Sequence, residues 1–214
     1  MGNLAGIFIS SFLIALSGAI VPGPVLSVTI SESAKGNFWA GPMIVLGHGL
    51  LEIALIVLLV TGFADFINNT KLLGVISTLG GIYLLWLAFL MLNDVRHVKI
   101  KINGERHMWG GPVFAGIVTS LANPYWIIWW ATIGLGYVIV SMRFGLIGIT
   151  VFFLGHILAD LSWYSMVSFI VSRGKNFISG RIYGRIISIC AFMLIFFGIT
   201  FGAWGIKQLA VFAV

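Results

Sequence analysis

Long apolar stretches separated by short polar segments make up most of the chain. Cutting the sequence at its charged residues leaves six such stretches, and a helix of about 20 apolar residues is long enough to cross a bilayer. The stretches do not alternate apolar and polar residues with period two, so they indicate transmembrane helices and not a β-barrel. They cover about Leu4 to Ile30, about Gly41 to Phe63, about Leu72 to Leu92, a run that starts near Pro112, about Phe144 to Val171 and about Ile186 to Ile206.

Two of the six stretches contain prolines that should break a helix. The first stretch includes Pro22-Gly23-Pro24, and the fourth, which is too long for one straight crossing, includes Asn123-Pro124. Proline lacks a backbone N–H and clashes with the carbonyl four residues earlier, while Gly23 lets the chain turn sharply. We expect broken helices with Pro22, Gly23, Pro24 and Pro124 as gate elements and Asn123 as a ligand for solute or ion. A plain packing kink is the alternative at each break.

The two halves of the chain resemble each other. The second stretch contains Leu46-Gly47-His48-Gly49-Leu50-Leu51-Glu52, and the fifth contains the matching Leu154-Gly155-His156-Ile157-Leu158-Ala159-Asp160. A duplication of three crossings places the second copy upside down in the membrane, as in many secondary transporters. The sequence therefore predicts an all-α polytopic membrane protein with six transmembrane helices in two inverted three-helix repeats. We expect one membrane domain, residues 1–214, divided into a first repeat (about 1–92), a basic loop (about 93–110) and a second repeat (about 111–214).

Composition agrees with a membrane protein and excludes several other classes. Of the 214 residues, 60% are hydrophobic and 8% are charged, which is about a third of the charge usual in a soluble domain. The net charge of +6 does not indicate a nucleic-acid partner, because the basic residues are scattered through loops without an aromatic-basic module. The single cysteine, Cys190, excludes an intrachain disulfide and dithiol redox chemistry. No cofactor is expected.

The positions of lysine and arginine predict the orientation in the membrane. Nine of the 12 basic residues lie in the loops after the first, third and fifth stretches, and the positive-inside rule places these loops in the cytoplasm. We therefore expect a multi-pass protein of the cytoplasmic membrane with both termini outside, as a monomer or a homo-oligomer. The nine residues are Lys35, Arg96, Lys99, Lys101, Arg106, Arg173, Lys175, Arg181 and Arg185.

Two of the six acidic residues lie deep inside their apolar stretches. Glu52 and Asp160 are placed close to the bilayer centre by the helical rise of about 1.5 Å per residue. An acid facing lipid there costs at least about 2.5 to 3.5 kcal/mol, so both should face the bundle interior and mark a functional site. Each follows a histidine by four residues, His48 or His156, on the same helix face. The two pairs should converge between the repeats as a substrate- or ion-binding cluster.

Such a cluster suits more than one function. A buried carboxylate can exchange a proton for a cationic group, and a histidine can relay that proton, which favours proton-coupled export of a small cationic or zwitterionic solute. Two imidazoles and two carboxylates can also hold a divalent metal. Divalent metal efflux is therefore the first alternative, and an intramembrane metal-dependent hydrolase is the second. The leading hypothesis is an exporter without enzymatic activity and without a metal at the site; pairs that only hold helices together are the structural alternative.

A group of aromatic residues follows the Asn123-Pro124 break. These side chains could wall a cavity and make a cation–π contact with a solute, or they could pack against lipid. Packing against lipid is the expectation that we prefer. The residues are Tyr125, Trp126, Trp129 and Trp130.

With Pro22-Gly23-Pro24, the region from Gly36 to Gly47 and Asn123-Pro124, the sequence resembles the lysine exporter superfamily, which includes the threonine and homoserine exporters. The resemblance extends over nearly the whole chain, because it includes the length, the six spans and the basic central loop. It implies efflux of amino acids through the cytoplasmic membrane, driven by the proton motive force. The expected partners are therefore an amino acid, protons and the lipid bilayer. Val25 departs from the polar residue that many members carry after Pro-Gly-Pro.

Overall fold

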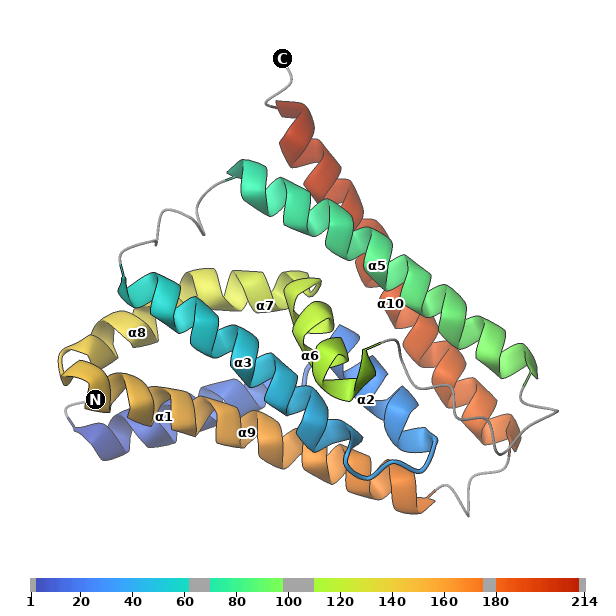
Figure 1. Cartoon of the computed structure of the whole chain (residues 1–214), viewed down its shortest axis with the longest axis horizontal. Helices are drawn as coiled ribbons and strands as arrows, with labels where there is room; N and C mark the ends of the chain where they lie inside the picture. Colours follow the sequence, from blue (N-terminus) through green and yellow to red (C-terminus); the bar gives the residue numbers. More distant parts are fainter. Residues whose placement is uncertain (1–2, 62–69, 98–109, 175–179, 212–214) are drawn as a thin grey trace.

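The computed structural model describes residues 3–61, 70–97, 110–174 and 180–211, and all of the regular structure in these ranges is helical (Figure 1). The predicted all-α fold is therefore confirmed. Most of the predicted basic loop at 93–110 lies outside the described residues. In chain order the helices are α1 (Leu4–Ala19), α2 (Pro24–Ala34), α3 (Ala40–Val60), α5 (Thr70–His97), α6 (Gly111–Leu121), α7 (Pro124–Trp129), the π-helix η1 (Trp130–Gly134), α8 (Leu135–Met142), α9 (Gly145–Gly174) and α10 (Gly180–Val211).

Within the described ranges, five helical segments are long and apolar enough to cross a membrane. Four of them lie in α3, α5, α9 and α10, and the fifth runs from Tyr125 to Met142 through α7, η1 and α8. The bent pair α1 and α2, with an angle of 72° between its helices, brings the number to six when the pair is counted as one span. The long fourth stretch is divided at Asn123-Pro124 into the short apolar helix α6 and the segment Tyr125–Met142. We use the term broken spans for the two stretches that a proline break divides, α1 with α2 and α6 with the segment that begins at α7.

The first break separates α1 from α2 at the predicted proline motif. α1 ends at Ala19, and α2 begins at Pro24 with Gly23 as its N-cap. Proline suits the first position of a helix, because the N–H that it lacks would have no intrahelical partner there. Glycine has no side chain that could cap the helix, and α2 has no side-chain cap hydrogen bond. The first turn of α2 therefore keeps backbone N–H groups that no capping side chain occupies.

The second break separates α6 from α7 and is capped differently. α6 ends at Leu121, and Pro124 is the first residue of α7. The side-chain oxygen of Asn123 accepts a hydrogen bond from the backbone N–H of Tyr125 at 3.1 Å. Asparagine is among the preferred N-cap residues for this reason. The two broken spans therefore differ at the point where their second helices begin.

The helices form two groups that meet at the broken spans. α5 and α10 lie side by side along their length, and α9 packs against both α1 and α3 (Figure 1). α2 lies between these groups, in contact with α9 and α10, while α6 contacts α3 and α5. The outer surface carries large exposed apolar side chains, including Leu146 (78% exposed) and Phe89 (66% exposed). A bilayer provides an apolar environment for such a surface, whereas water does not.

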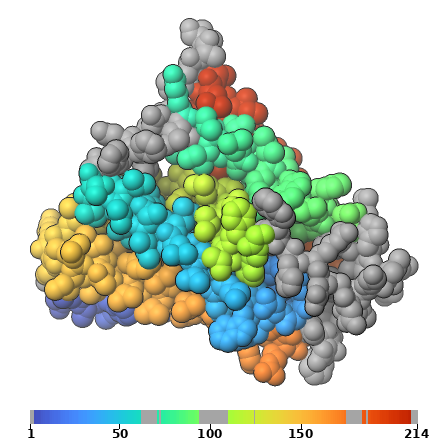
Figure 2. All heavy atoms as spheres, in the orientation of Figure 1, coloured from blue at the N-terminus to red at the C-terminus, as the bar shows by residue number. Residues whose placement is uncertain are grey.

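Two glycines of the repeated motif allow close helix contacts. A Cβ atom at Gly47 would lie 1.9 Å from the carbonyl oxygen of Val113 on α6, and one at Gly155 would lie 2.2 Å from Ser11 Oγ on α1. Small residues let helix backbones approach closely in membranes. Figure 2 shows the side chains of α3 and α6 packed against each other on the visible face. Gly47 and Gly155 thus each face the first helix of a broken span. The inverted relation of the two halves and the boundaries of the repeats stay predictions.

Replacing Gly47 with alanine should destabilise the protein. The new methyl group would push the backbone of α6 away from α3, and overpacking of this kind typically costs about 1 to 3 kcal/mol. Gly136→Ala is the matched control, because a Cβ at Gly136 meets no atom within 4 Å. Thermal unfolding in detergent should give a lower midpoint for Gly47→Ala than for the wild type and an unchanged or higher midpoint for Gly136→Ala. Equal midpoints for the two variants would contradict the close contact.

Candidate functional site

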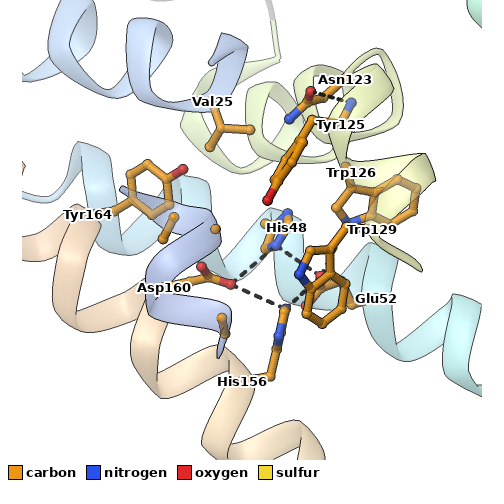
Figure 3. A pocket seen from close by; sticks show the side chains of 13 residues that line it. Val25, His48, Glu52, Asn123, Tyr125, Trp126, Trp129, His156, Asp160 and Tyr164 are labelled. Atoms are coloured by element: carbon orange, nitrogen blue, oxygen red, sulfur yellow. Dashed lines mark hydrogen bonds and ion pairs between the residues drawn. The ribbon is translucent and has the colours of Figure 1, made fainter. Parts of the chain in front are cut away.

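The structure brings together the four residues that the sequence singled out for a cluster. His48 and Glu52 lie one turn apart on α3, and His156 and Asp160 lie one turn apart on α9 (Figure 3). All four side chains are buried, and one nitrogen or oxygen atom from each lies within 4.8 Å of the other three. Four titratable side chains from two helices therefore share one small volume.

Each imidazole faces both carboxylates. The Nε2 atoms of His48 and His156 each lie 3.0 Å from Glu52 Oε1. The same two nitrogen atoms lie 3.4 Å and 3.5 Å, respectively, from Asp160 Oδ2. Nitrogen and oxygen atoms therefore alternate around a closed ring of four, and the contacts within one helix are no shorter than the contacts between the helices.

Glu52 is held by additional donors from the segment Tyr125–Met142. The indole N–H groups of Trp126 and Trp130 donate to Glu52 Oε1 at 3.2 Å and 2.9 Å, and the Glu52 side chain is fully buried. Trp130 begins the π-helix η1, a local distortion that is frequent at functional sites. Four nitrogen atoms thus approach one carboxylate oxygen, which fixes the position of Glu52.

Asp160 has a different environment. Among the described residues, no hydrogen-bond partner meets its Oδ2 atom, because the two imidazole contacts are long. His156 Nδ1 also lacks a partner there, while His48 Nδ1 is 2.7 Å from Ser120 Oγ on α6. A buried polar atom without a partner is costly. Glu52 Oε2 also has no hydrogen-bond partner among the described residues, so each carboxylate of the cluster keeps one oxygen atom without such a partner.

A cavity of about 60 Å³ adjoins the cluster, with room for a few water molecules. Its walls come from both broken spans and from α3 and α9 (Figure 3). Pro22, Gly23 and Pro24 are not among the lining residues and instead define the ends of α1 and α2. The lining residues are Ala15, Gly18, Ala19, Val25, His48, Glu52, Asn123, Tyr125, Trp126, Trp129, His156, Asp160 and Tyr164.

The expectation that the aromatic residues after Asn123-Pro124 pack against lipid is wrong for most of them. Trp126 and Trp129 line the cavity, and Trp130 is almost completely buried against Glu52. Tyr125 also lines the cavity, although 42% of it is exposed. The indole donors form hydrogen bonds inside the bundle, which accounts for the inward orientation of Trp126 and Trp130.

Sequence reasoning did not find several of the residues that complete the site. The hydrogen bond between Ser120 and His48 and the cavity position of Tyr164 were not predicted. The role of the two indoles as donors to Glu52 was not predicted either. Trp126 and Trp130 are four residues apart, which places them on one helix face. This spacing could have indicated that they act together, but not which way the face points.

The model of the LysE type translocator family matches residues 16–204. This chain belongs to the LysE type translocator family. It is therefore a multi-pass membrane transporter and not an enzyme, which removes the hydrolase alternative. The predicted resemblance to the lysine exporter superfamily is confirmed.

Two relatives share most of their length with this LysE family member. A Bacillus subtilis protein named as amino acid efflux protein YcgF is 22% identical over 205 residues, which is 95% of this chain and 98% of the relative. The chemotactic transduction protein ChpE of Pseudomonas aeruginosa is 24% identical over 167 residues, which is 75% of this chain and 79% of the relative. No solved structure gives a significant match.

Proposed function

We propose that this LysE family transporter is a secondary active exporter of amino acids, coupled to protons and operating by alternating access. The observation that carries the proposal is the buried ring of two histidines and two carboxylates beside a cavity between both broken spans. Buried ionisable groups in a membrane are expensive and are typical of solute and proton pathways. The name of the Bacillus subtilis relative supports an amino acid as the solute.

The two ends of the cavity suit the two charges of an amino acid. Both carboxylates keep an oxygen without a hydrogen-bond partner among the described residues, but Glu52 is already held by two indoles and two imidazoles. We therefore assign the ammonium of the solute to Asp160. The N-terminus of α2 near Val25 has no capping side chain, and helix N-termini attract carboxylates. α7 is already capped by Asn123. We therefore assign the solute carboxylate to α2.

The two helix breaks support the alternating-access part of the proposal. They lie beside the cavity of about 60 Å³, which has room for a few water molecules. The two breaks beside the cavity, with the gate residues Pro22, Gly23, Pro24 and Pro124, are the places where half-helices can shift. In the proposed cycle, a proton taken up by the cluster from outside releases the solute from Asp160, and the proton then leaves to the cytoplasm.

The orientation belongs to the same proposal. We assign the chain to the cytoplasmic membrane with both termini outside, because the basic residues are concentrated in the loops after the first, third and fifth spans. A cysteine introduced near either end should then react with a membrane-impermeant thiol reagent in intact cells. If the cysteines at both ends react with the reagent only after the cells are broken open, this orientation is wrong.

Transport in proteoliposomes tests the function. Vesicles containing the purified protein are loaded with labelled amino acids, and release is followed with and without an acidic outside medium that contains a metal chelator. We expect at least one amino acid to leave faster than from protein-free vesicles, with acceleration by the proton gradient and a simultaneous change of internal pH. If no amino acid is released faster than from protein-free vesicles, the proposal of amino-acid export is wrong. If the release rate is the same with and without the proton gradient and the internal pH stays constant, the proposal of proton coupling is wrong.

Trp130→Phe should reduce export without unfolding the protein. The change removes the N–H that donates to Glu52 Oε1 but keeps a ring that can pack against Phe152. A hydrogen bond to a charged group contributes about 1.5 to 3 kcal/mol, so initial export rates should fall by about tenfold or more. Trp204→Phe is the control, because Trp204 lies on α10 and is 41% exposed. Equal rates in both variants would show that the indole donor does not matter.

A further inference from the structure

The ring of nitrogen and oxygen atoms has the dimensions of a metal site. Zn²⁺ binds histidine nitrogen and carboxylate oxygen at about 2.0 to 2.2 Å and prefers four ligands in a tetrahedron, which places neighbouring ligand atoms about 3.3 to 3.6 Å apart. The four nitrogen–oxygen separations in the ring are 3.0, 3.0, 3.4 and 3.5 Å, and all four atoms lie within 4.8 Å of one another, so the ring is flatter than a regular tetrahedron and must fold slightly around an ion. Small side-chain movements would therefore bring all four atoms to bonding distance of one central ion.

The surroundings of the ring also suit a metal. A histidine that binds metal usually donates its other N–H to a neighbouring oxygen, which leaves the binding nitrogen free. His48 has such a neighbour, because its Nδ1 lies 2.7 Å from Ser120 Oγ while its Nε2 points into the ring. Among the described residues, Asp160 Oδ2 has no hydrogen-bond partner although it is buried. An ion at the centre of the ring would supply that partner.

We propose that His48, Glu52, His156 and Asp160 form a binding site for one divalent transition-metal ion of the Zn²⁺ type. The two imidazoles are borderline ligands that select such ions over Mg²⁺ and Ca²⁺, which prefer oxygen ligands. Since two ligands come from α3 and two from α9, a bound ion ties these helices together. The next step rests on the proposed function. Zn²⁺ bound to the ring occupies the place of the solute ammonium at Asp160 and therefore inhibits export.

Metal binding to the detergent-purified, chelator-stripped full chain tests the proposal. Titration calorimetry with Zn²⁺ should show one ion per chain, and Co²⁺ should give the intense visible absorption of a tetrahedral complex. His48→Ala combined with His156→Ala should weaken binding by at least about 100-fold. Ser120→Ala should weaken it by about 10- to 100-fold through the loss of the neighbour of His48. Glu32→Gln is the control, because Glu32 is a buried acid that pairs with Lys35 outside the ring, and this variant should bind Zn²⁺ as the wild type does.

Folding must be checked before these affinities are compared. Each variant should elute as the wild type does in gel filtration and keep its helical circular dichroism; if the double histidine variant does not, Asp160→Asn replaces it and should weaken binding at least tenfold. No stoichiometric binding up to millimolar Zn²⁺, or unchanged affinity in the ring variants, overturns the metal site. If the protein exports amino acids in the presence of chelator but does not bind Zn²⁺, the proposed function is supported and the metal site is wrong. If it binds Zn²⁺ but releases no amino acid, the metal site is supported and the proposed function is wrong.

The same vesicles give a second readout. Saturating Zn²⁺ should lower amino-acid release at least tenfold in the wild type, and removal of the ion with a chelator should restore it. Release that continues unchanged with Zn²⁺ bound to the ring would overturn the inhibition. Movement of the Zn²⁺ itself across the vesicle membrane would identify the ion as cargo, which is the divalent metal efflux that the residue pattern first suggested, and would overturn its role as an inhibitor.

Discussion

Replacing Asp160 with asparagine should nearly abolish amino-acid export while leaving the protein folded. Asparagine keeps the shape of the side chain but removes the charge that we assign to the solute ammonium. Loss of one partner of a buried charge pair typically costs about 2 to 5 kcal/mol, so release from proteoliposomes should fall by about 30-fold or more. The unfolding midpoint should change little, because Asp160 Oδ2 has only long contacts with His48 and His156.

Glu32→Gln is the matched control for this experiment. Glu32 is as buried as Asp160 but forms an ion pair with Lys35 on the next helical turn, away from the histidine ring. The export rate of Glu32→Gln should stay within about threefold of the wild-type rate, and a threefold change corresponds to less than about 1 kcal/mol. An export rate of Asp160→Asn as high as that of Glu32→Gln would contradict the role of Asp160 as the ammonium site.

Replacing Glu52 with alanine should have the largest effect on stability. The change leaves two imidazoles and the indole N–H groups of Trp126 and Trp130 facing a space without an acceptor. Breaking a buried, hydrogen-bonded charge cluster on one side costs about 3 to 5 kcal/mol. We expect a clear drop of the unfolding midpoint in detergent and loss of export.

Glu52→Gln separates the charge of Glu52 from its shape. The amide oxygen of glutamine can still accept from the indole N–H groups, so this variant should recover most of the stability that Glu52→Ala loses. Its export should remain impaired if the carboxylate charge is part of the transport cycle. Similar stability of Glu52→Ala and the wild type would contradict the anchoring role that the four short contacts assign to Glu52.

Much of the fold could be predicted from the sequence, because the signals are local. Apolar stretches of about 20 residues indicate spans wherever they occur, and the breaks at Pro22-Gly23-Pro24 and Asn123-Pro124 follow from the missing N–H of proline. The cluster of His48, Glu52, His156 and Asp160 could also be singled out, since mid-membrane acids are costly and each lies one turn from a histidine. For these residues the position along the helix was sufficient information.

The environment of each acid could not be predicted, because it depends on contacts between distant helices. The repeated motif makes Glu52 and Asp160 look equivalent, yet only Glu52 receives hydrogen bonds from Trp126 and Trp130. Which way an indole points depends on the rotation of its helix, which the π-helix η1 alters at Trp130. An apolar, aromatic segment in a membrane gives no periodic polar face from which that rotation could be inferred.

The closely packed pair of α5 and α10 connects the two helix breaks. A Cβ at Gly81 on α5 would lie 2.6 Å from the backbone of Gly202 on α10, so the two helices are in direct backbone contact. α10 also touches α2 and α5 touches α6, which are one half of each broken span. If α2 shifts in the proposed transport cycle, it would push on α10, and the close pair of α10 and α5 would transmit that movement to α6. We therefore expect the two breaks to move in concert.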